Sequence, residues 1–137
     1  MSAPPPEGRV EVDFNLTEEQ RIFCESVRSF GARELAAGAL ERAHSEAYPW
    51  DVARKMAANG LLGISIPEAD GGMGGRLMDA VLAIEEIAAA CPRSADVIQA
   101  GNFGAIRVLA QFASPDQKAR YLKPLLAGDG LISVAMT

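Results

Sequence analysis

The chain has 137 residues, a length that fits one domain with a single hydrophobic core. Thirteen lysines and arginines against 18 aspartates and glutamates give a formal net charge of -5. This charge excludes the basic patch of a nucleic-acid-binding protein and the polybasic anchor of a membrane-surface protein. No apolar run approaches the roughly 20 residues that cross a bilayer. The amino terminus lacks a basic segment followed by an apolar one, which predicts a cytoplasmic protein.

The cysteines and the single histidine offer little chemistry of their own. Cys24 and Cys91 are far apart in a chain without a signal peptide, which predicts two reduced thiols rather than a disulfide. With His44 as the one histidine, neither a histidine-rich metal site nor a Ser-His-Asp triad is expected. The composition therefore indicates no metal site.

The first helix is predicted to follow an amino-terminal tail. Residues 1–13 contain three consecutive prolines and little that could be buried, so we interpret them as the tail. A helix is predicted from Thr17 to about Ala37, with Thr17 as N-cap and Gln20 completing a capping box. Its apolar face is expected to contain Phe23, Val27 and Phe30.

Two further helices are predicted on either side of a glycine-rich loop. One begins at Pro49 and ends at Asn59-Gly60, and the other runs from Leu77 to the residue before Cys91-Pro92. Between them, residues 60–75 include six glycines, which predicts a folded-over loop. The apolar faces are expected to contain Val52 and Met56 in the first helix, and Leu77, Val81, Ile84 and Ala88 in the second.

A fourth helix is predicted from about Ser94 to Phe112, and a fifth from the cap residue Ser114 to about Leu126. Gly101 and Gly104 lower helix propensity, so we expect them to permit the close approach of another element. The apolar stripe of the fourth helix would contain Ile98, Gly101, Ala105, Val108 and Phe112. The last residues, 131–137, are predicted to be extended. The fold class is therefore all-α, a bundle of about five helices that ends in the start of a β-strand.

Two motifs suggest chemistry, and each has a plainer interpretation. The glycines at positions 71, 72, 74 and 75 resemble a phosphate-binding loop, but the spacing of a dinucleotide fingerprint and a Walker lysine are both missing. A turn with unusual backbone angles is the favoured interpretation. Glu85 and Glu86 are adjacent acids, but neighbours on a helix point about 100° apart and cannot converge on one bond. A solvated helix face is the favoured interpretation.

Four segments, in this order, resemble the N-terminal domain of the acyl-CoA dehydrogenase family: LTEEQRIFCESVRSF, MAANGLLGISIPEADGGMGG, EEIAAACPRSA and GNFGAIRVLAQFASPDQKARYLKPLLAGDGLISVAMT. The resemblance covers roughly residues 14–137. It implies that residues 14–130 form the N-terminal helical domain of that family. Residues 131–137 would then be the first strand of a middle β-domain.

The resemblance also implies an activity. Members of this family are FAD-dependent enzymes that desaturate an acyl-CoA thioester between its α and β carbons. A glutamate takes the α proton, FAD accepts the hydride, and the electrons pass to an electron-transferring flavoprotein. The subunit has three domains and is usually a homotetramer. The catalytic glutamate lies in the C-terminal bundle, beyond the end of this sequence, so no catalytic residue is assigned here and the chain alone is expected to be inactive.

The resemblance places candidate binding residues in two regions. Met136 and Thr137 correspond to the positions beside the flavin ring, where a donor near N5 would stabilise the negative charge that arrives with the hydride. The competing interpretation is that they simply end a strand. Asp96, Ala100 and Gly104 correspond to the helix face that lines the acyl pocket. Ala100 and Gly104 are small, which predicts an acyl group longer or bulkier than butyryl, whereas helix packing is the competing interpretation.

Two hypotheses about the chain as a whole follow. In the first, it is part of an acyl-CoA dehydrogenase, or of the related acyl-CoA oxidases, whose remaining domains would cover it. In the second, it is a non-catalytic helical interaction module that pairs with a longer homologue. The apolar segment LISVAMT favours the first hypothesis, because an unpaired strand edge promotes aggregation.

Overall fold

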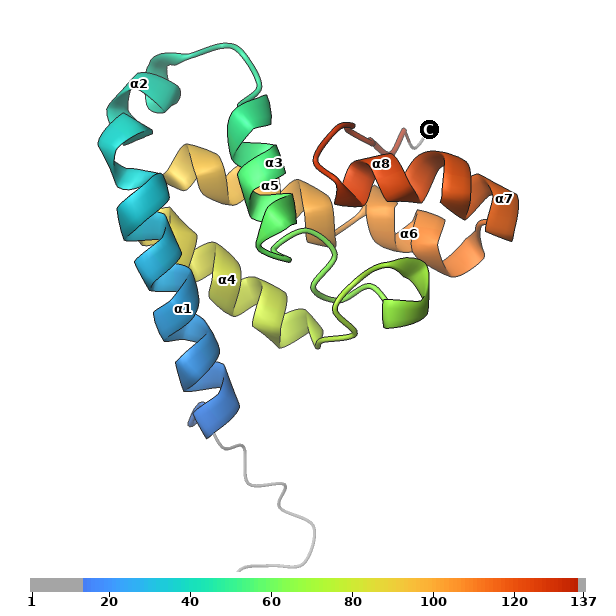
Figure 1. Cartoon of the computed structure of the whole chain (residues 1–137), viewed down its shortest axis with the longest axis horizontal. Coiled ribbons are helices and arrows are strands. Elements are labelled where there is room, and N and C mark those ends of the chain that lie inside the picture. Colours follow the sequence, from blue (N-terminus) through green and yellow to red (C-terminus); the bar gives the residue numbers. More distant parts are fainter. Residues whose placement is uncertain (1–13, 136–137) are drawn as a thin grey trace, which may run out of the picture.

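The computed structural model describes residues 14–135 and is helical throughout its ordered elements (Figure 1). Two 3-10 turns, η1 (Ala36–Gly38) and η2 (Glu68–Asp70), and a π turn, η3 (Lys118–Leu122), supplement the α-helices. Within this described range no strand is formed, so the all-α prediction is confirmed. None of the described helices is long and apolar enough to cross a membrane. The helices are α1 (Glu18–Glu34), α2 (Ala39–His44), α3 (Trp50–Ala58), α4 (Leu77–Ala90), α5 (Pro92–Asn102), α6 (Ala105–Phe112), α7 (Pro115–Gln117) and α8 (Lys123–Leu126).

The first helix begins with the predicted capping box. The Gln20 amide donates to the Thr17 hydroxyl at 3.2 Å, and the Thr17 amide donates to the Gln20 side-chain oxygen at 3.1 Å. These two bonds satisfy amides that have no partner within the helix. The helix ends at Glu34 rather than near Ala37, because Leu35 leaves helical geometry with φ -121° and ψ -29°. The chain then passes through η1 into α2, a six-residue helix that the sequence analysis missed.

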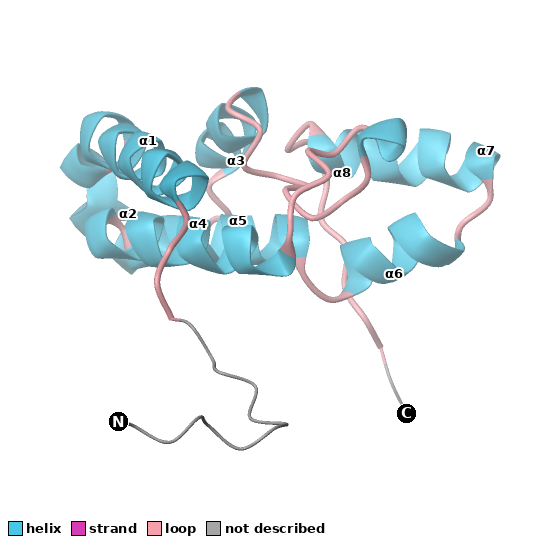
Figure 2. Ribbon diagram, turned by 90° about the horizontal axis from the view of Figure 1, so that it is seen from below, coloured by secondary structure: helices cyan, strands magenta, loops and turns pink. Residues whose placement is uncertain are grey.

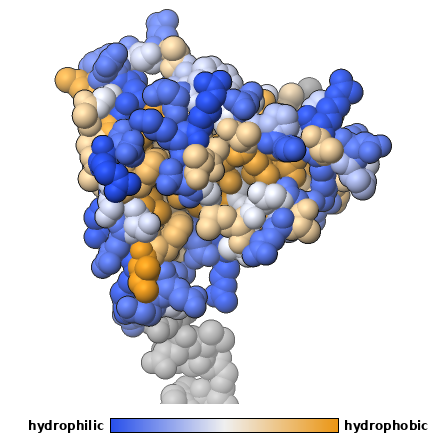
Figure 3. Space-filling view, viewed as in Figure 1, coloured by the Kyte–Doolittle hydropathy of each residue, from blue (hydrophilic) through white to orange (hydrophobic). Residues whose placement is uncertain are grey.

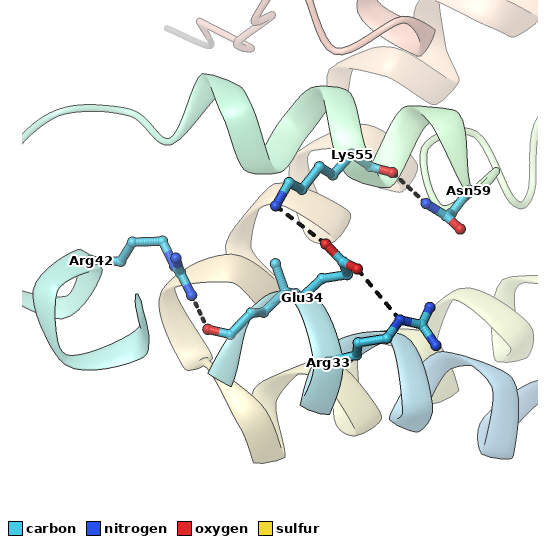
Figure 4. A network of polar contacts seen from close by, with 6 residues as sticks. Arg33, Glu34, Arg42, Lys55 and Asn59 are labelled. Atoms are coloured by element: carbon cyan, nitrogen blue, oxygen red, sulfur yellow. Dashed lines mark hydrogen bonds and ion pairs between the residues drawn. The ribbon is translucent and has the colours of Figure 1, made fainter. Parts of the chain in front are cut away.

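Polar contacts hold α2 and α3 to the end of α1 (Figure 4). The Glu34 carboxylate accepts from the Lys55 ammonium of α3 at 3.3 Å and from the Arg33 guanidinium at 3.4 Å. The hydrogen bond from Lys55 is the main cause that lowers the pKa of the Glu34 carboxyl. From α2, Arg42 donates to the carbonyl of Leu35, the residue that follows α1. These contacts fix the short second helix across the carboxyl end of α1.

The main core lies where α4 packs against α1 and α5, with α3 against α5. Figure 2 shows the two layers, α1 and α3 above α4 and α5. The predicted face of α1 is confirmed, because Val27 and Phe30 are buried in this core and Phe23 packs against it in a partly buried position. The predicted face of α3 is confirmed as well, because Val52 and Met56 are buried there. A second, smaller cluster lies beneath α6 and the C-terminal helices and contains Ile66, Ile106, Ala110, Leu122 and Leu125.

The predicted apolar face of α4 is partly wrong. Leu77 and Val81 are each 42% exposed, whereas Ile84 and Ala88 pack at the border of the core. The residues that face α1 and α5 are instead Ala80, Leu82, Ala83 and Ile87. Apolar residues surround this helix on most sides, so periodicity does not distinguish one face from another. The alanines are buried because they allow the neighbouring helices to approach closely.

The predicted fourth helix is two helices. The chain leaves helical geometry at Phe103 and Gly104, and Gly104 has φ 63° and ψ -124°, a conformation open to glycine and strained for other residues. The change of direction overturns the single apolar stripe, because Val108 and Phe112 on α6 are 55% and 75% exposed. Gly101 and Ile98 remain on the buried side of α5.

The predicted fifth helix is confirmed as one continuous segment, residues 115–126, which we call the α7–α8 segment. Ser114 and Gln117 form the predicted capping box at its start. Pro124 lacks an N–H, and the preceding turn widens to the π form, with the Lys123 amide bonded to the Lys118 carbonyl.

The predicted start of a β-strand has no counterpart in the described part of the chain. Residues 131–135 run without regular secondary structure, and Leu131 and Val134 are each about half exposed. A strand is defined by hydrogen bonds to a neighbouring strand, and none of the described residues supplies one. The strand therefore stays a prediction.

Candidate functional site

The glycine run at the end of the loop, residues 71–75, uses all of its backbone amides within the loop. Each of the five consecutive amides from position 71 to position 75 donates to a backbone carbonyl of the loop itself. The acceptors are, in order, Glu68, Pro67, Gly63, Ile66 and Ile64, at 2.8–3.1 Å. A phosphate-binding loop needs free amides directed at the anion. The turn interpretation of these glycines is therefore the one that the geometry supports.

Asn102 is the side chain that fastens this loop to the helices. It is completely buried at the last residue of α5. Its side-chain oxygen accepts from the Ile64 amide at 2.6 Å, and its side-chain nitrogen donates to the carbonyls of Leu61 and Ile98, each at 2.9 Å. Both N–H groups of the Asn102 side chain are thus in use, and its oxygen accepts one hydrogen bond.

Asn102 belongs to none of the sites predicted from the sequence, although its position carries a signal. Asn102 follows Ile98 by four residues, on the buried side of α5, where Ser94 is the other polar residue among the described residues. A polar residue in a buried apolar stripe is informative, because burial is costly unless the group is hydrogen-bonded. The hydrogen-bond partners lie some 40 positions away in the chain, which no local pattern reveals.

The three residues predicted to line an acyl pocket do not lie on one helix face. Asp96 and Ala100 share a face of α5, whereas Gly104 lies beyond the end of that helix. Asp96 is exposed and pairs with Arg93 at 3.6 Å. Ala100 borders a cavity of only about 10 Å³, which has no room for an acyl chain. The assignment of Asp96, Ala100 and Gly104 to a pocket stays a prediction that concerns a larger assembly.

The two glycines of this region differ in their surroundings. A Cβ at Gly101 would lie 2.7 Å from the Leu62 Cδ2 atom, so the predicted close approach is confirmed there. A Cβ at Gly104 would have no neighbour within 4 Å, so the prediction is wrong for that position. The backbone conformation at position 104 requires a glycine, whereas the close contact with Leu62 at position 101 requires a residue without a side chain.

The predicted flavin residues Met136 and Thr137 lie outside the described residues. Their assignment therefore stays a prediction. In the glycine-rich loop, the amides of residues 71–75 all bond within the loop and offer no donor to a pyrophosphate. This glycine run therefore does not form a site that fits FAD.

The adjacent acids of α4 have different roles. Glu85 is exposed, as expected of a solvated face. Glu86 has a side chain that is only 15% exposed, and it accepts two hydrogen bonds from Arg28 of α1, at 2.7 and 2.8 Å. The solvated-face interpretation is thus wrong for Glu86. The pair joins two helices and offers no second carboxylate for acid–base chemistry.

Replacing Arg28 with alanine should lower the free energy of unfolding slightly, because a two-bond ion pair is lost but the arginine is mostly exposed. The matched control is Arg21→Ala, which removes an exposed pair within α1 and should cost less. Urea denaturation at low salt and at high salt measures the free energy of unfolding of both variants. An Arg28 effect that salt does not reduce would contradict an electrostatic role for the pair.

The two cysteines are free and buried. Burial raises the pKa of the Cys24 thiol. Burial also acts to raise the pKa of Cys91, but hydrogen bonds from Ser94 and Arg42 outweigh it, and the pKa lies below its usual value. The Ser94 hydroxyl lies 3.0 Å from the Cys91 sulfur at the start of α5.

These features define a class of protein: an all-α domain in which a glycine-rich loop is held against two helices by one buried asparagine. The sequence profile described as "Acyl-CoA dehydrogenase, N-terminal domain" matches residues 17–129. The chain therefore belongs to the acyl-CoA dehydrogenase family, as the N-terminal domain.

Individual relatives agree with this assignment. The chain is 29% identical over 126 residues to the short-chain-specific acyl-CoA dehydrogenase of Clostridium acetobutylicum, covering 92% of this chain and 33% of that protein. It is 34% identical over 116 residues to the 3-sulfinopropanoyl-CoA desulfinase of Paraburkholderia xenovorans, covering 85% and 30%. The solved structure of butyryl-CoA dehydrogenase from Megasphaera elsdenii matches with a TM-score of 0.74 and 31% identity, covering 88% and 32%. The chain thus spans about a third of the length of these relatives.

Proposed function

We propose that this chain is the N-terminal helical part of an FAD-dependent acyl-CoA dehydrogenase. In that reaction an acyl-CoA thioester loses its α proton to a base and a hydride from its β carbon to the flavin. The product is the α,β-unsaturated thioester, and the electrons then pass to an electron-transferring flavoprotein. The observation that carries the proposal is the family match over residues 17–129, which includes nearly all the described helices.

The chain's own residues would shape the assembly rather than perform the proton or hydride transfer. FAD, when bound to the complete enzyme, supplies the hydride acceptor. In this proposal Met136 and Thr137 contact the flavin edge, and Asp96, Ala100 and Gly104 border the acyl group. Asn102 would hold the carboxyl end of α5 in place through its bonds to the loop. Assembly as a homotetramer belongs to the same proposal.

A chimera tests the proposal. Residues 14–137 of this chain would replace the matching N-terminal segment of the Megasphaera elsdenii butyryl-CoA dehydrogenase. We expect the chimera to bind FAD and its flavin absorbance to bleach on addition of an acyl-CoA, whereas the 137-residue chain alone should do neither. Octanoyl-CoA should bleach it at least as fast as butyryl-CoA if the acyl pocket is deep beside Ala100.

The control for the chimera is the parent enzyme cut and rejoined at the same two junctions. If the rejoined parent is active and the chimera is folded and flavin-loaded but inert toward acyl-CoA of any length, the proposed function is wrong. Loss of FAD from the chimera, with FAD retained by the rejoined parent, would contradict the proposed flavin contacts of Met136 and Thr137.

The second candidate is a non-catalytic interaction module that pairs with a longer homologue. Exposed apolar side chains on α6 and after α8 favour this second candidate, since patches of such residues mark contact surfaces. They are Val108, Phe112, Leu131 and Val134. Under this hypothesis the isolated chain binds the intact relative and the chimera is inactive. Size-exclusion chromatography of the mixture distinguishes the two hypotheses.

A further inference from the structure

A groove of about 690 Å³ lies between η2 and the α7–α8 segment. Its volume is within the range of small-molecule binding sites, about 300–1,000 Å³. Figure 3 shows that apolar surface gathers across this middle part of the molecule, between the glycine-rich loop and the C-terminal helices. We call it the α7–α8 groove.

The walls of the α7–α8 groove are mainly aliphatic. Ala113 and Pro115 lie at the start of the α7–α8 segment, and Ala119 and Leu126 line it further along. Alanine side chains leave the groove wide, and none of these four side chains carries a hydrogen-bonding group. An unbranched hydrocarbon chain is the kind of ligand body that such walls would remove from water.

The charged side chains of the groove have an excess of positive charge. Lys118 is paired with Asp70 at 2.8 Å, in a partly buried contact that fixes η2 against the π turn. Lys123 also lines the groove, and no acidic partner for it is found among the described residues. Two lysines against one aspartate leave one positive charge in the groove, whereas the chain as a whole carries -5. An anionic group is therefore favoured here over a neutral or cationic one.

We propose that the α7–α8 groove binds a free aliphatic carboxylate, with the hydrocarbon chain along the alanine and leucine walls and the carboxylate beside Lys123. The proposal rests on the groove's volume, its walls and its charge. It does not depend on the proposed acyl-CoA dehydrogenase activity.

Isothermal titration of the 137-residue chain with decanoate, below its micelle concentration, tests the ligand class. We expect saturable binding of one decanoate per chain. Decan-1-ol, which has the chain without the charge, and acetate, which has the charge without the chain, should each bind at least about tenfold more weakly. Equal binding of decan-1-ol would overturn the role of Lys123. No saturable binding of decanoate would overturn the proposal and leave the groove as a surface for polypeptide.

Two pairs of variants test the location. Lys123→Glu should weaken decanoate binding by at least about tenfold, whereas Arg120→Glu, the same charge change on a neighbouring residue that does not line the groove, should weaken it far less. Ala119→Trp should abolish binding by filling the groove, whereas Ala32→Trp on the exposed side of α1 should leave it unchanged. Thermal unfolding confirms that each variant is folded. Equal effects within either pair would place the ligand elsewhere and overturn the proposal.

Discussion

Replacing Asn102 with alanine should lower the free energy of unfolding by about 3 kcal/mol, and the unfolding midpoint by about 10 °C. The substitution leaves the Ile64 amide and the Leu61 carbonyl buried with no partner from this side chain. It also leaves a void at a completely buried position. Chemical denaturation followed by circular dichroism measures the change.

The matched control is Asn59→Ala. Asn59 makes one side-chain hydrogen bond, to the Lys55 carbonyl at 2.8 Å, and it is exposed at the end of α3. Its removal should cost less than about 0.5 kcal/mol, because water replaces the lost bond. Similar losses for Asn59→Ala and Asn102→Ala would show that burial of the Asn102 bonds contributes nothing.

Asn102→Asp separates hydrogen bonding from packing, because the shape is kept. The new carboxyl would face the carbonyls of Leu61 and Ile98, so burial and these acceptors raise its pKa above the roughly 3.9 of an exposed aspartate. Below about pH 4 it is protonated in both the folded and the unfolded chain, and the loss of stability relative to wild type is smallest. The loss should grow as the pH rises toward 7, since only the unfolded chain ionises freely. A loss that does not change with pH would contradict this geometry.

Replacing Gly128 with alanine should cost about 3 kcal/mol of unfolding free energy, through a steric and a conformational effect together. Gly128 follows α8 with φ 75°, a region that is strained for residues with a side chain. A Cβ there would lie 2.6 Å from both the carbonyl carbon and the oxygen of Ala53, so the backbone of α3 or the turn must move. Denaturant titration of the single variant measures the cost.

Gly104→Ala is the matched control for Gly128→Ala. Its φ of 63° imposes a similar conformational strain, but nothing lies within 4 Å of the added Cβ. The expected cost is about 1 kcal/mol, which represents the backbone term alone. If both variants lose the same stability, contact with α3 is not what constrains Gly128. A smaller loss for Gly128 than for Gly104 would contradict the packing of the last turn against α3.

The parts of the fold that were predicted correctly depend on neighbours in the chain. The capping boxes at Thr17 and Ser114 involve residues three positions apart, and both formed as expected. The end of α4 before Cys91 also follows from a local rule, because Pro92 restricts the residue before it. Hydrophobic periodicity identified the buried face of α1, where polar residues occupy the other side.

The errors arose where the decisive contact is distant in the sequence. The break between α5 and α6 requires Gly104 at a positive φ, and the pattern of Ile98, Ala105 and Val108 continues across it as if the helix were unbroken. Helix α4 is apolar on most sides, so its buried face was decided by the helices that pack on it. The Glu86 carboxylate is partly buried because Arg28 of α1 reaches it.

Residue order along the chain was enough to predict the helical class, the two capping boxes, the bounds of α3 and α4 and, through the resemblance of four segments, the acyl-CoA dehydrogenase family. Each of these depends on residue order over short distances or on recognisable motifs. Three features became visible in the folded chain alone: the amides of residues 71–75 bond within the glycine-rich loop, Asn102 anchors this loop, and lysines and alanines line the α7–α8 groove. Hydrogen bonds, ion pairs and packing between distant residues form on folding, and no local pattern specifies which partners meet.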